Sequence, residues 1–210
     1  HFRSEDGYVE WIRDRNGNRI SFSYSVVSSV PLITNTTITD QLNRQVLIES
    51  GVTDATYGYG TRVTFRGFGG NTRYIFLTSK PLSQALRTTQ SGDSSTVKTY
   101  QQLFALNGAF SNAYDPYRTT DIWLPDGRRY QLYYNVYGDV ARVVFPTGGA
   151  VEYDWQGGIE GYDSSGLFWG AEPFIYRRTI ARRVYLTTSL SSLVNQTSYG
   201  KIQFTGWSAS

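Results

Sequence analysis

The chain has 210 residues, of which 18% are charged, and its formal net charge is only +3. So small a net charge gives no electrostatic reason to expect a nucleic-acid partner, and the absence of Cys excludes disulfides and thiolate metal sites. Aromatic residues make up 16% of the chain and Gly occurs 21 times, which favours an all-β fold with many turns.

Residues 1–90 are expected to form an N-terminal β segment that begins with a hairpin. Tyr8–Ile12 is rich in apolar residues, and Asp14–Asn18 follows it with the Asn-Gly dipeptide typical of hairpin turns. Ile20, Phe22 and Tyr24 then alternate with serines, which is the period of a half-buried strand.

The strand pattern continues through the rest of this segment with interruptions. Pro31 lies inside the apolar run Val26–Ile33 and indicates an edge strand or a broken one. Gln41–Glu49 fits either a strand or a short helix. Thr61–Phe65 and Tyr74–Leu77 predict two further strands between turns rich in Gly.

Residues 91–120 are expected to be a connection, formed by a loop or a short helix. Gln90–Ser95 is polar and is the strongest candidate for a boundary between two halves. Val97, Tyr100 and Phe104 recur at helical spacing, but over so few residues the spacing leaves a helix and a loop equally open.

Residues 121–210 are expected to be a second β segment, organised by regularly spaced turns. Gly127, Gly138 and Gly149 lie 11 residues apart, and each closes a cluster of turn-forming residues. Gly supplies the positive φ that such turns require. A constant spacing of strand and turn is also typical of a repeat.

Alternation along these strands predicts which side chains are buried. Trp11, Tyr134, Tyr153 and Trp155 fall on the apolar phase of their strands, so we expect them in the apolar interior. Glu152 and Asp154 fall on the opposite phase, and we expect them on a solvated face.

The C-terminal residues predict two more strands. Phe174–Leu186 follows the Gly-rich residues 156–170 as a long strand, Ser189–Ser198 is polar and turn-like, and Lys201–Trp207 ends the chain as a strand. Lys201–Trp207 and Ser21–Ser25 contain no Pro and a single charge between them, so we expect unprotected edges that associate with further strands.

The central stretch resembles a known family. Residues 124–138 read L-P-D-G-R-x-Y-x-x-x-Y-N-x-Y-G and residues 146–155 read P-T-G-G-x-x-x-Y-x-W, as in the RHS/YD repeat. Asp14–Tyr24 is similar to a further unit, D-x-x-G-x-x-x-x-x-x-Y, in which Gly17 is the turn residue. The resemblance implies antiparallel hairpin repeats that form a curved, shell-like sheet on secreted or cell-surface proteins of bacteria.

The residues for catalysis are few. His1 is the only His and Cys is absent, so neither a Cys–His nor a Ser–His scheme has its partners. Glu152 with Asp154, and Glu160 with Asp163, are the carboxylate pairs that glycosidic chemistry would use. Their settings in a solvated strand face and a loop favour a structural role, so we assign no catalytic residue and expect no enzyme.

The sequence offers one candidate metal site and one candidate anion site. Asp14, Asn16 and Asn18 have the alternate spacing of some Ca²⁺ loops, but no distal Glu completes the ligand set and a turn is favoured. No metal or cofactor is therefore expected. Four arginines lie close together in one strand, where Arg178 and Arg182 are expected on one face and Arg177 and Arg183 on the other, which favours arginines spread along a sheet over an anion site.

Three functions remain open. The first is a non-enzymatic structural or interaction segment of an RHS/YD-type β wall, whose partner is itself or the remainder of a larger chain. The second is a carbohydrate-binding β module, with Trp169 and Trp207 as candidate ligand-contacting aromatics. The third is a subunit of an extracellular filament. A start at His1 suggests a processed product or fragment, and no apolar run is long enough to span a membrane.

Overall fold

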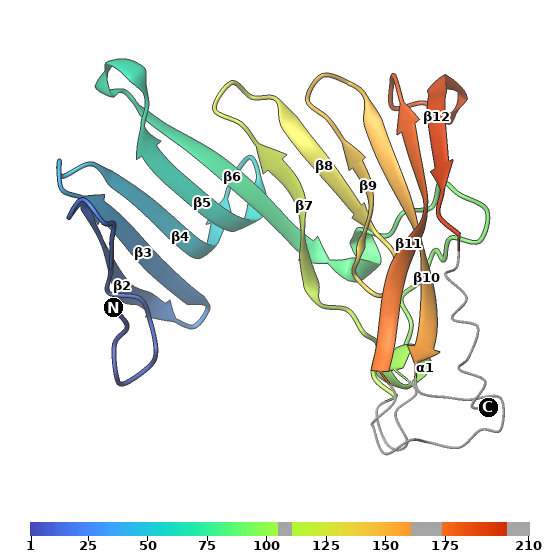
Figure 1. Ribbon diagram of the computed structural model, residues 1–210, viewed down its shortest axis with the longest axis horizontal. Helices are drawn as coiled ribbons and strands as arrows, with labels where there is room; N and C mark the ends of the chain where they lie inside the picture. The colour runs from blue at the N-terminus through green and yellow to red at the C-terminus, as the bar shows by residue number, and fades with distance from the viewer. Residues whose placement is uncertain (105–110, 161–173, 201–210) are drawn as a thin grey trace, which may run out of the picture. The chain divides into compact units, whose positions relative to one another are not determined.

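The computed structural model describes residues 1–104, 111–160 and 174–200. The protein is all-β and forms one open antiparallel sheet of 12 strands, with 56% of residues in strands and 8% in helices. Strands that follow one another in the chain are neighbours in the sheet (Figure 1). The predictions of antiparallel pairing and of a low helix content are confirmed.

The strands are short to medium in length, and the turns between most of them are tight. The helices are one-turn elements that lie outside the sheet. The strands are β1 (Trp11–Arg13), β2 (Arg19–Ser29), β3 (Leu32–Asp40), β4 (Gln45–Asp54), β5 (Gly58–Arg66), β6 (Thr72–Pro81), β7 (Tyr117–Trp123), β8 (Arg129–Tyr134), β9 (Val140–Val144), β10 (Ala150–Glu160), β11 (Phe174–Tyr185) and β12 (Leu193–Ser198). The helices are η1 (Phe68–Gly70), η2 (Leu82–Gln84), α1 (Tyr100–Phe104) and η3 (Leu190–Ser192).

The chain divides into two compact units. Unit 1 contains His1–Pro81 and Tyr117–Gln131, and unit 2 contains Leu82–Pro116 and Leu132–Ser210. Strand β8 contributes residues to both units. The sequence suggests three continuous segments with boundaries near residues 90 and 120. Each compact unit instead combines two separate stretches of chain, so these boundaries stay a prediction.

Unit 1 is a single layer of sheet. Apart from its strands, unit 1 contains only the single turn η1 (Phe68–Gly70) (Figure 1). Among its described large apolar side chains only Phe76 is fully buried. Aromatic rings pack around Phe76. The centre of the Tyr57 ring lies 5.4 Å from that of Phe76 and 5.0 Å from that of Trp123, and the Arg129 guanidinium lies 4.6 Å from the centre of the Trp123 ring.

One turn construction recurs through both units. The first residue of the turn donates its N–H to the carbonyl of the fifth, and the fourth donates its N–H to the carbonyl of the first. In each turn the fourth residue has a positive φ, which a left-handed position requires. The six turns span Asp14–Asn18, Asp40–Arg44, Gly67–Asn71, Leu124–Arg128, Asn135–Asp139 and Phe145–Gly149.

The predicted turn glycines agree with this construction in three of four cases. Gly17, Gly127 and Gly138 have positive φ. In the turn after β9 the positive φ is at Gly148 (+96°), so the assignment of that role to Gly149 is wrong. The sequence alone cannot show which residue of the pair Gly148-Gly149 has the positive φ, because both are glycine.

The turn between β3 and β4 is the one that the sequence does not reveal. Its left-handed residue is Asn43, with a φ of +59°, and not a glycine. The sequence pattern of Gln41–Glu49 fits either a strand or a short helix, because no glycine marks the turn. In the structure this segment is a turn followed by strand β4, which begins at Gln45. Pro31 lies in the turn between β2 and β3, which confirms the broken strand.

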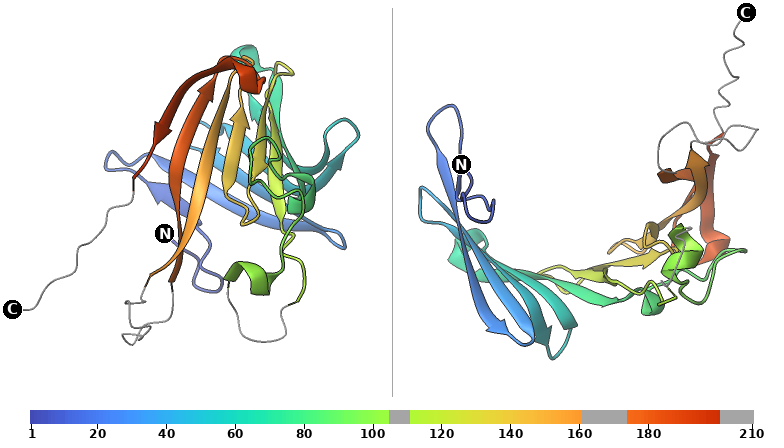
Figure 2. Two further views of the ribbon diagram at one scale, coloured as in Figure 1. Left: turned by 90° about the vertical axis from the view of Figure 1, so that its right-hand side faces the viewer. Right: turned by 90° about the horizontal axis from the view of Figure 1, so that it is seen from below.

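Unit 2 has an apolar core beside its sheet. Leu82, Ala85 and Leu86 are buried against Tyr134 at the end of β8, and Leu86 forms a parallel β-bridge with Tyr134. Figure 2 shows α1 and the loop before it beside the strands of this unit and outside the sheet. In the described part of residues 91–120, both alternatives occur, since α1 (Tyr100–Phe104) follows a loop, but the expected connection extends too far because β7 begins at Tyr117.

The burial predictions hold in part. Tyr134 is buried as predicted. Trp11, Tyr153 and Trp155 are only half-buried, so their placement in an apolar interior is wrong. Glu152, expected on a solvated face, is completely buried, because the segment that begins at Leu82 covers this part of the sheet.

One of the two C-terminal strands differs from the sequence-based prediction. Phe174–Tyr185 is β11, as predicted, but Leu193–Ser198 forms strand β12 where a polar turn was expected. This prediction failed because a strand that is exposed on both faces has no alternation to detect. Residues 201–207 lie outside the described part of the chain. None of the described helices is both long and apolar enough to cross a membrane.

Candidate functional site

Glu152 is the centre of a buried polar cluster on β9, β10 and β11. Its Oε1 accepts hydrogen bonds from Arg142 Nη1 at 2.6 Å and Thr89 Oγ1 at 2.8 Å. Its Oε2 accepts from Gln90 Nε2 at 2.6 Å and Tyr185 Oη at 3.0 Å. Four donors therefore replace the water that this carboxylate loses on burial.

The partners of Glu152 are themselves held in place. Arg142 also donates through Nη2 to the carbonyl of Thr188, and its guanidinium lies 5.7 Å from the centre of the Tyr185 ring. Burial raises the pKa of Tyr185, and the hydrogen bond to the Glu152 carboxylate raises it further. The Tyr185 hydroxyl is therefore kept protonated as a hydrogen-bond donor.

Arg87 fills the gap where β9 and β10 part. The β9–β10 ladder ends at the pair Arg142–Glu152. Just past this point the Arg87 Nη1 donates to the carbonyls of Ala141 at 3.3 Å and Tyr153 at 3.1 Å. Trp155 Nε1 donates in a similar way to the carbonyl of β9's first residue, Val140, at 2.9 Å. Side chains thus satisfy backbone acceptors that the ladder leaves open.

Two carboxylates hold the Arg87 guanidinium from the other side. Asp93 accepts from Arg87 Nε and Nη2, with a shortest distance of 2.7 Å, and Asp154 Oδ1 accepts from Nη2 at 3.0 Å. Asp154 Oδ2 accepts from Arg183 Nη2 at 2.6 Å. Burial alone would raise the pKa of Asp154, but the hydrogen bond from Arg183 and the charge of Arg87 outweigh it and lower that pKa below its ordinary value.

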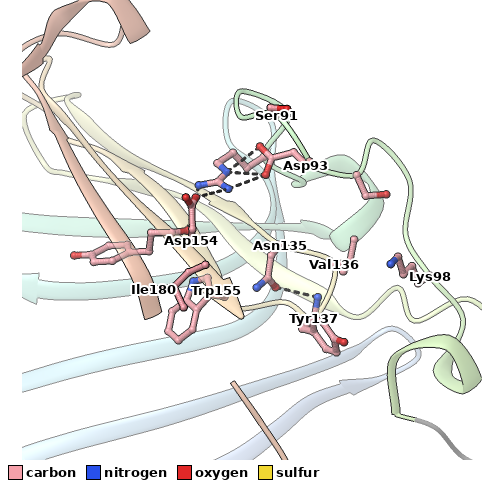
Figure 3. Close-up of a pocket in the computed structure, with 13 residues that line it drawn as sticks. Ser91, Asp93, Lys98, Asn135, Val136, Tyr137, Asp154, Trp155 and Ile180 are labelled. Atoms are coloured by element: carbon pink, nitrogen blue, oxygen red, sulfur yellow. Dashed lines mark hydrogen bonds and ion pairs between the residues drawn. The ribbon is translucent and has the colours of Figure 1, made fainter. Parts of the chain in front are cut away.

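A cavity of about 330 Å³ opens beside this ion-pair network. Figure 3 shows Asp93 and Asp154 toward one side of it and the rings of Trp155 and Tyr137 toward the other. The lining comes from the loop before α1, the turn between β8 and β9, and strands β10 and β11, all in unit 2. It consists of Arg87, Ser91, Gly92, Asp93, Ser94, Lys98, Asn135, Val136, Tyr137, Tyr153, Asp154, Trp155 and Ile180.

Neither Asp154 nor Glu152 is suited to act as a general acid. A general acid must hold a proton near neutral pH, which requires a raised pKa, whereas that of Asp154 is lowered. Glu152 is sealed from the cavity by its four donors and has no exposed surface. The other predicted pair, Glu160 and Asp163, has side chains outside the described part of the chain. His1 stacks on Trp11 and pairs with Glu10 in unit 1.

The remaining sequence candidates have structural surroundings. Asp14 Oδ1 accepts the backbone N–H groups of Asn16 and Asn18, as the turn interpretation predicts. These hydrogen bonds contribute to lowering the pKa of Asp14, after the larger one from the Asn18 side chain. Among the residues that the structure describes, no three His, Asp or Glu side chains are grouped as metal ligands.

The arginines of β11 differ from their predicted arrangement. Arg182 is paired across the sheet with Tyr153, whereas Arg178 is paired with Gln156, two residues beyond Asp154. The ladder skips Ile180 at this point, so the alternation of side chains restarts one residue out of phase. The prediction that Arg178 and Arg182 share a face is therefore wrong. The side chain of Arg177 is outside the described part of the chain.

Neither predicted ligand-contacting aromatic belongs to the described site. Trp169 and Trp207 both lie outside the described residues. The sequence missed Arg87, Thr89 and Gln90, which approach β10 from more than 60 residues away in the chain. Asp93, the one charge in the loop Gln90–Ser95, was the only local signal for this network.

No family model matches the chain, and no curated protein matches it.

Proposed function

We propose that the chain is a non-enzymatic structural and interaction segment of a longer β wall of the RHS/YD-repeat type. The observation that carries this proposal is the single-layer sheet of unit 1. A sheet is stable when its apolar face is buried against a second layer. On the strands of this unit the exposed large apolar side chains include Ile20, Val26, Val27 and Leu32.

The recurring turns support a repeat origin for this wall. Three of the six turns also share a side-chain device, in which Oδ1 of the first residue accepts the N–H groups of the third and fifth. The first residues are Asp14, Asp40 and Asn135. The turns at Asp14 and Asn135 lie within the stretches that resemble the family, and the turn at Asp40 has the same device outside them, which supports a wider repeat.

The end of the strand order supports association. Strand β12 pairs with β11 alone among the described strands, and all six of its residues are exposed. Leu193–Ser198 contains neither a charge nor a Pro, the two devices that most often protect an edge. Its free side offers main-chain hydrogen bonds to a further strand, which a second copy or the remainder of a larger chain supplies.

The resemblance to RHS/YD proteins is the basis for placing this wall on a secreted or cell-surface bacterial protein. An extracellular filament is the assembly that results if the edge of β12 pairs with another copy of the chain. The absence of an activity is proposed from the network itself, since Glu152 is completely buried with four donors and Asp154 is held ionised by Arg87 and Arg183.

Light scattering across a concentration series tests the proposal. The chain is expected to grow in mass with concentration, and Asn195→Lys, which places a charge on the edge of β12, is expected to shift it toward the monomer. Ala55→Lys is the matched control, because Ala55 is exposed in the turn between β4 and β5. A chain that stays monomeric at every accessible concentration contradicts the association.

A further inference from the structure

The cavity of unit 2 has features that a structural wall does not require. It is held open by side chains, because Arg87 and Trp155 satisfy the carbonyls at the point where β9 and β10 separate. Arg87 is 7% exposed and makes bonds to Asp93, to Asp154 and to two carbonyl groups. A cavity with walls fixed in this way is preformed for a ligand.

The aromatic side of the cavity is held in a defined orientation. Trp155 is fixed by the hydrogen bond from its Nε1 to the Val140 carbonyl, so that hydrogen bond is not available to a ligand and the ring offers its apolar surface. Tyr137 is placed by the turn, in which Asn135 Oδ1 accepts its N–H at 2.9 Å (Figure 3). Both are aromatic surfaces that suit a flat apolar face of a ligand.

The polar side of the cavity offers mainly acceptors. Asp154 is ionised because its pKa is lowered, so its carboxylate accepts hydrogen bonds and donates none. Asp93 presents a second carboxylate at the same side, but its oxygens already accept from Arg87 and from the Gln90 N–H, so Asp154 is the carboxylate with acceptor capacity left for a ligand. Lys98 is exposed at the rim, and among the described residues no carboxylate lies within ion-pair distance of its ammonium group.

These groups select one class of ligand. A metal ion would compete with the Arg87 guanidinium for the same carboxylates, and the charges of the lining, Arg87 and Lys98 against Asp93 and Asp154, already balance, so nothing selects an anion. A wholly apolar ligand would bury the carboxylates without a donor. A neutral polyhydroxylated ring has hydroxyls that donate to carboxylates and accept from an ammonium, together with an apolar face for the aromatic rings.

We infer that this cavity binds a neutral pyranose unit of a polysaccharide, between Trp155 and Tyr137 on one side and Asp93 and Asp154 on the other, with Lys98 also in its lining. Its volume of about 330 Å³ is at the small end of ligand sites, which suits a single sugar ring rather than a long chain segment. The site is independent of the proposed wall, because all of its residues belong to unit 2 and none belongs to the edge strand β12.

Binding is tested by titrating the full chain with neutral hexasaccharides of glucose, mannose, galactose and N-acetylglucosamine, and with polygalacturonate as the acidic comparison. We expect saturable heat in calorimetry for at least one neutral sugar. Trp155→Phe, which keeps an apolar ring but loses the Nε1 bond, is expected to weaken that binding by about tenfold, and Lys98→Gln by about threefold.

Lys80→Gln is the matched control, because Lys80 is an exposed lysine in unit 1 outside the cavity, and its affinity is expected to be that of the unchanged chain. Circular dichroism on each variant confirms that the sheet is intact. The inference is overturned if no neutral sugar binds, if polygalacturonate alone binds, or if folded Trp155→Phe and Lys98→Gln variants bind as tightly as Lys80→Gln.

Failure of this test leaves the proposed wall unaffected, since the association is measured without sugar and through β12. Failure of the association leaves the sugar site unaffected, since binding is measured at a concentration below that at which the mass changes.

Discussion

Arg142 and Glu152 form a buried ion pair, in which Nη1 lies 2.6 Å from Oε1 and the side chains are 6% and 0% exposed. Adjacent strands β9 and β10 place them directly opposite each other. The loss of hydration on burial opposes the attraction between the two charges. The pair can therefore stabilise the fold only through its close geometry and the additional hydrogen bonds to Glu152.

Removing one member of this pair is expected to destabilise unit 2 strongly. Glu152→Leu leaves the Arg142 guanidinium buried without its carboxylate, which costs about 3–5 kcal/mol in the free energy of unfolding. The double variant Arg142→Met with Glu152→Leu is expected to lose less, because no charge remains unpaired. Urea denaturation measures both. A loss below about 1 kcal/mol for Glu152→Leu, the size typical of an exposed pair, would contradict the buried arrangement.

Arg87 is expected to be intolerant even of lysine. Lys keeps the charge but lacks the planar set of donors that reaches Asp93, Asp154 and two carbonyls together. Arg87→Lys should reduce the free energy of unfolding by at least about 2 kcal/mol. The control is Arg128→Lys, since Arg128 is exposed and pairs with Asp126 at the surface, and no measurable change is expected. Equal stabilities for the two variants would show that the guanidinium geometry is unimportant.

Asp154 is expected to make stability depend on pH in the acid range. Its pKa is lower in the folded chain than the ordinary 3.8, so its contribution is present above pH 3.8 and disappears as the pH falls through the folded value. Arg87 and Arg183 have raised pKa values and stay charged throughout this range. The unfolding free energies of the wild type and Asp154→Asn, measured from pH 7 to pH 2, should therefore converge below pH 3.8. A constant difference would rule this out.

The turn between β3 and β4 is expected to tolerate glycine and to reject alanine. Asn43 has a φ of +59°, and this conformation costs an ordinary L-residue about 1–2 kcal/mol. Asn43→Ala should therefore lower the unfolding free energy, whereas Asn43→Gly, which reproduces the residue at Gly17 and Gly127, should not. If both variants have the same denaturation midpoint, the turns are not equivalent.

A methyl group at Gly60 is expected to disturb the β5–β6 ladder. A Cβ built there would lie 1.9 Å from the carbonyl oxygen of Leu77 on the neighbouring strand. Gly60→Ala should cost about 1–3 kcal/mol or more, because the backbone of a packed sheet must move to admit it. Gly200→Ala is the control, with no atom within 4 Å of the added carbon and no positive φ. A thermal melt that is unchanged in Gly60→Ala would refute this close approach.

Most of the strands could be predicted because their signals are local. A hairpin is specified by its turn residues and by the alternation of its strands, which are both properties of neighbouring residues. The turn glycines Gly17, Gly127 and Gly138 and the alternation around Tyr134 are examples. The signals failed where a turn used Asn43 in place of Gly, and where β12 is exposed on both faces and shows no alternation.

The sequence by itself therefore determined the all-β class, the antiparallel pairing of successive strands and most of the turns. Only the tertiary structure decided which face of β10 is covered. The segment from Leu82 brings Arg87, Thr89 and Gln90 onto Glu152 and Asp154 across more than 60 residues of chain. Period-2 alternation reports that two faces differ in polarity. It does not report that a polar face is buried, because that depends on distant donors and charges that satisfy the carboxylates in place of water.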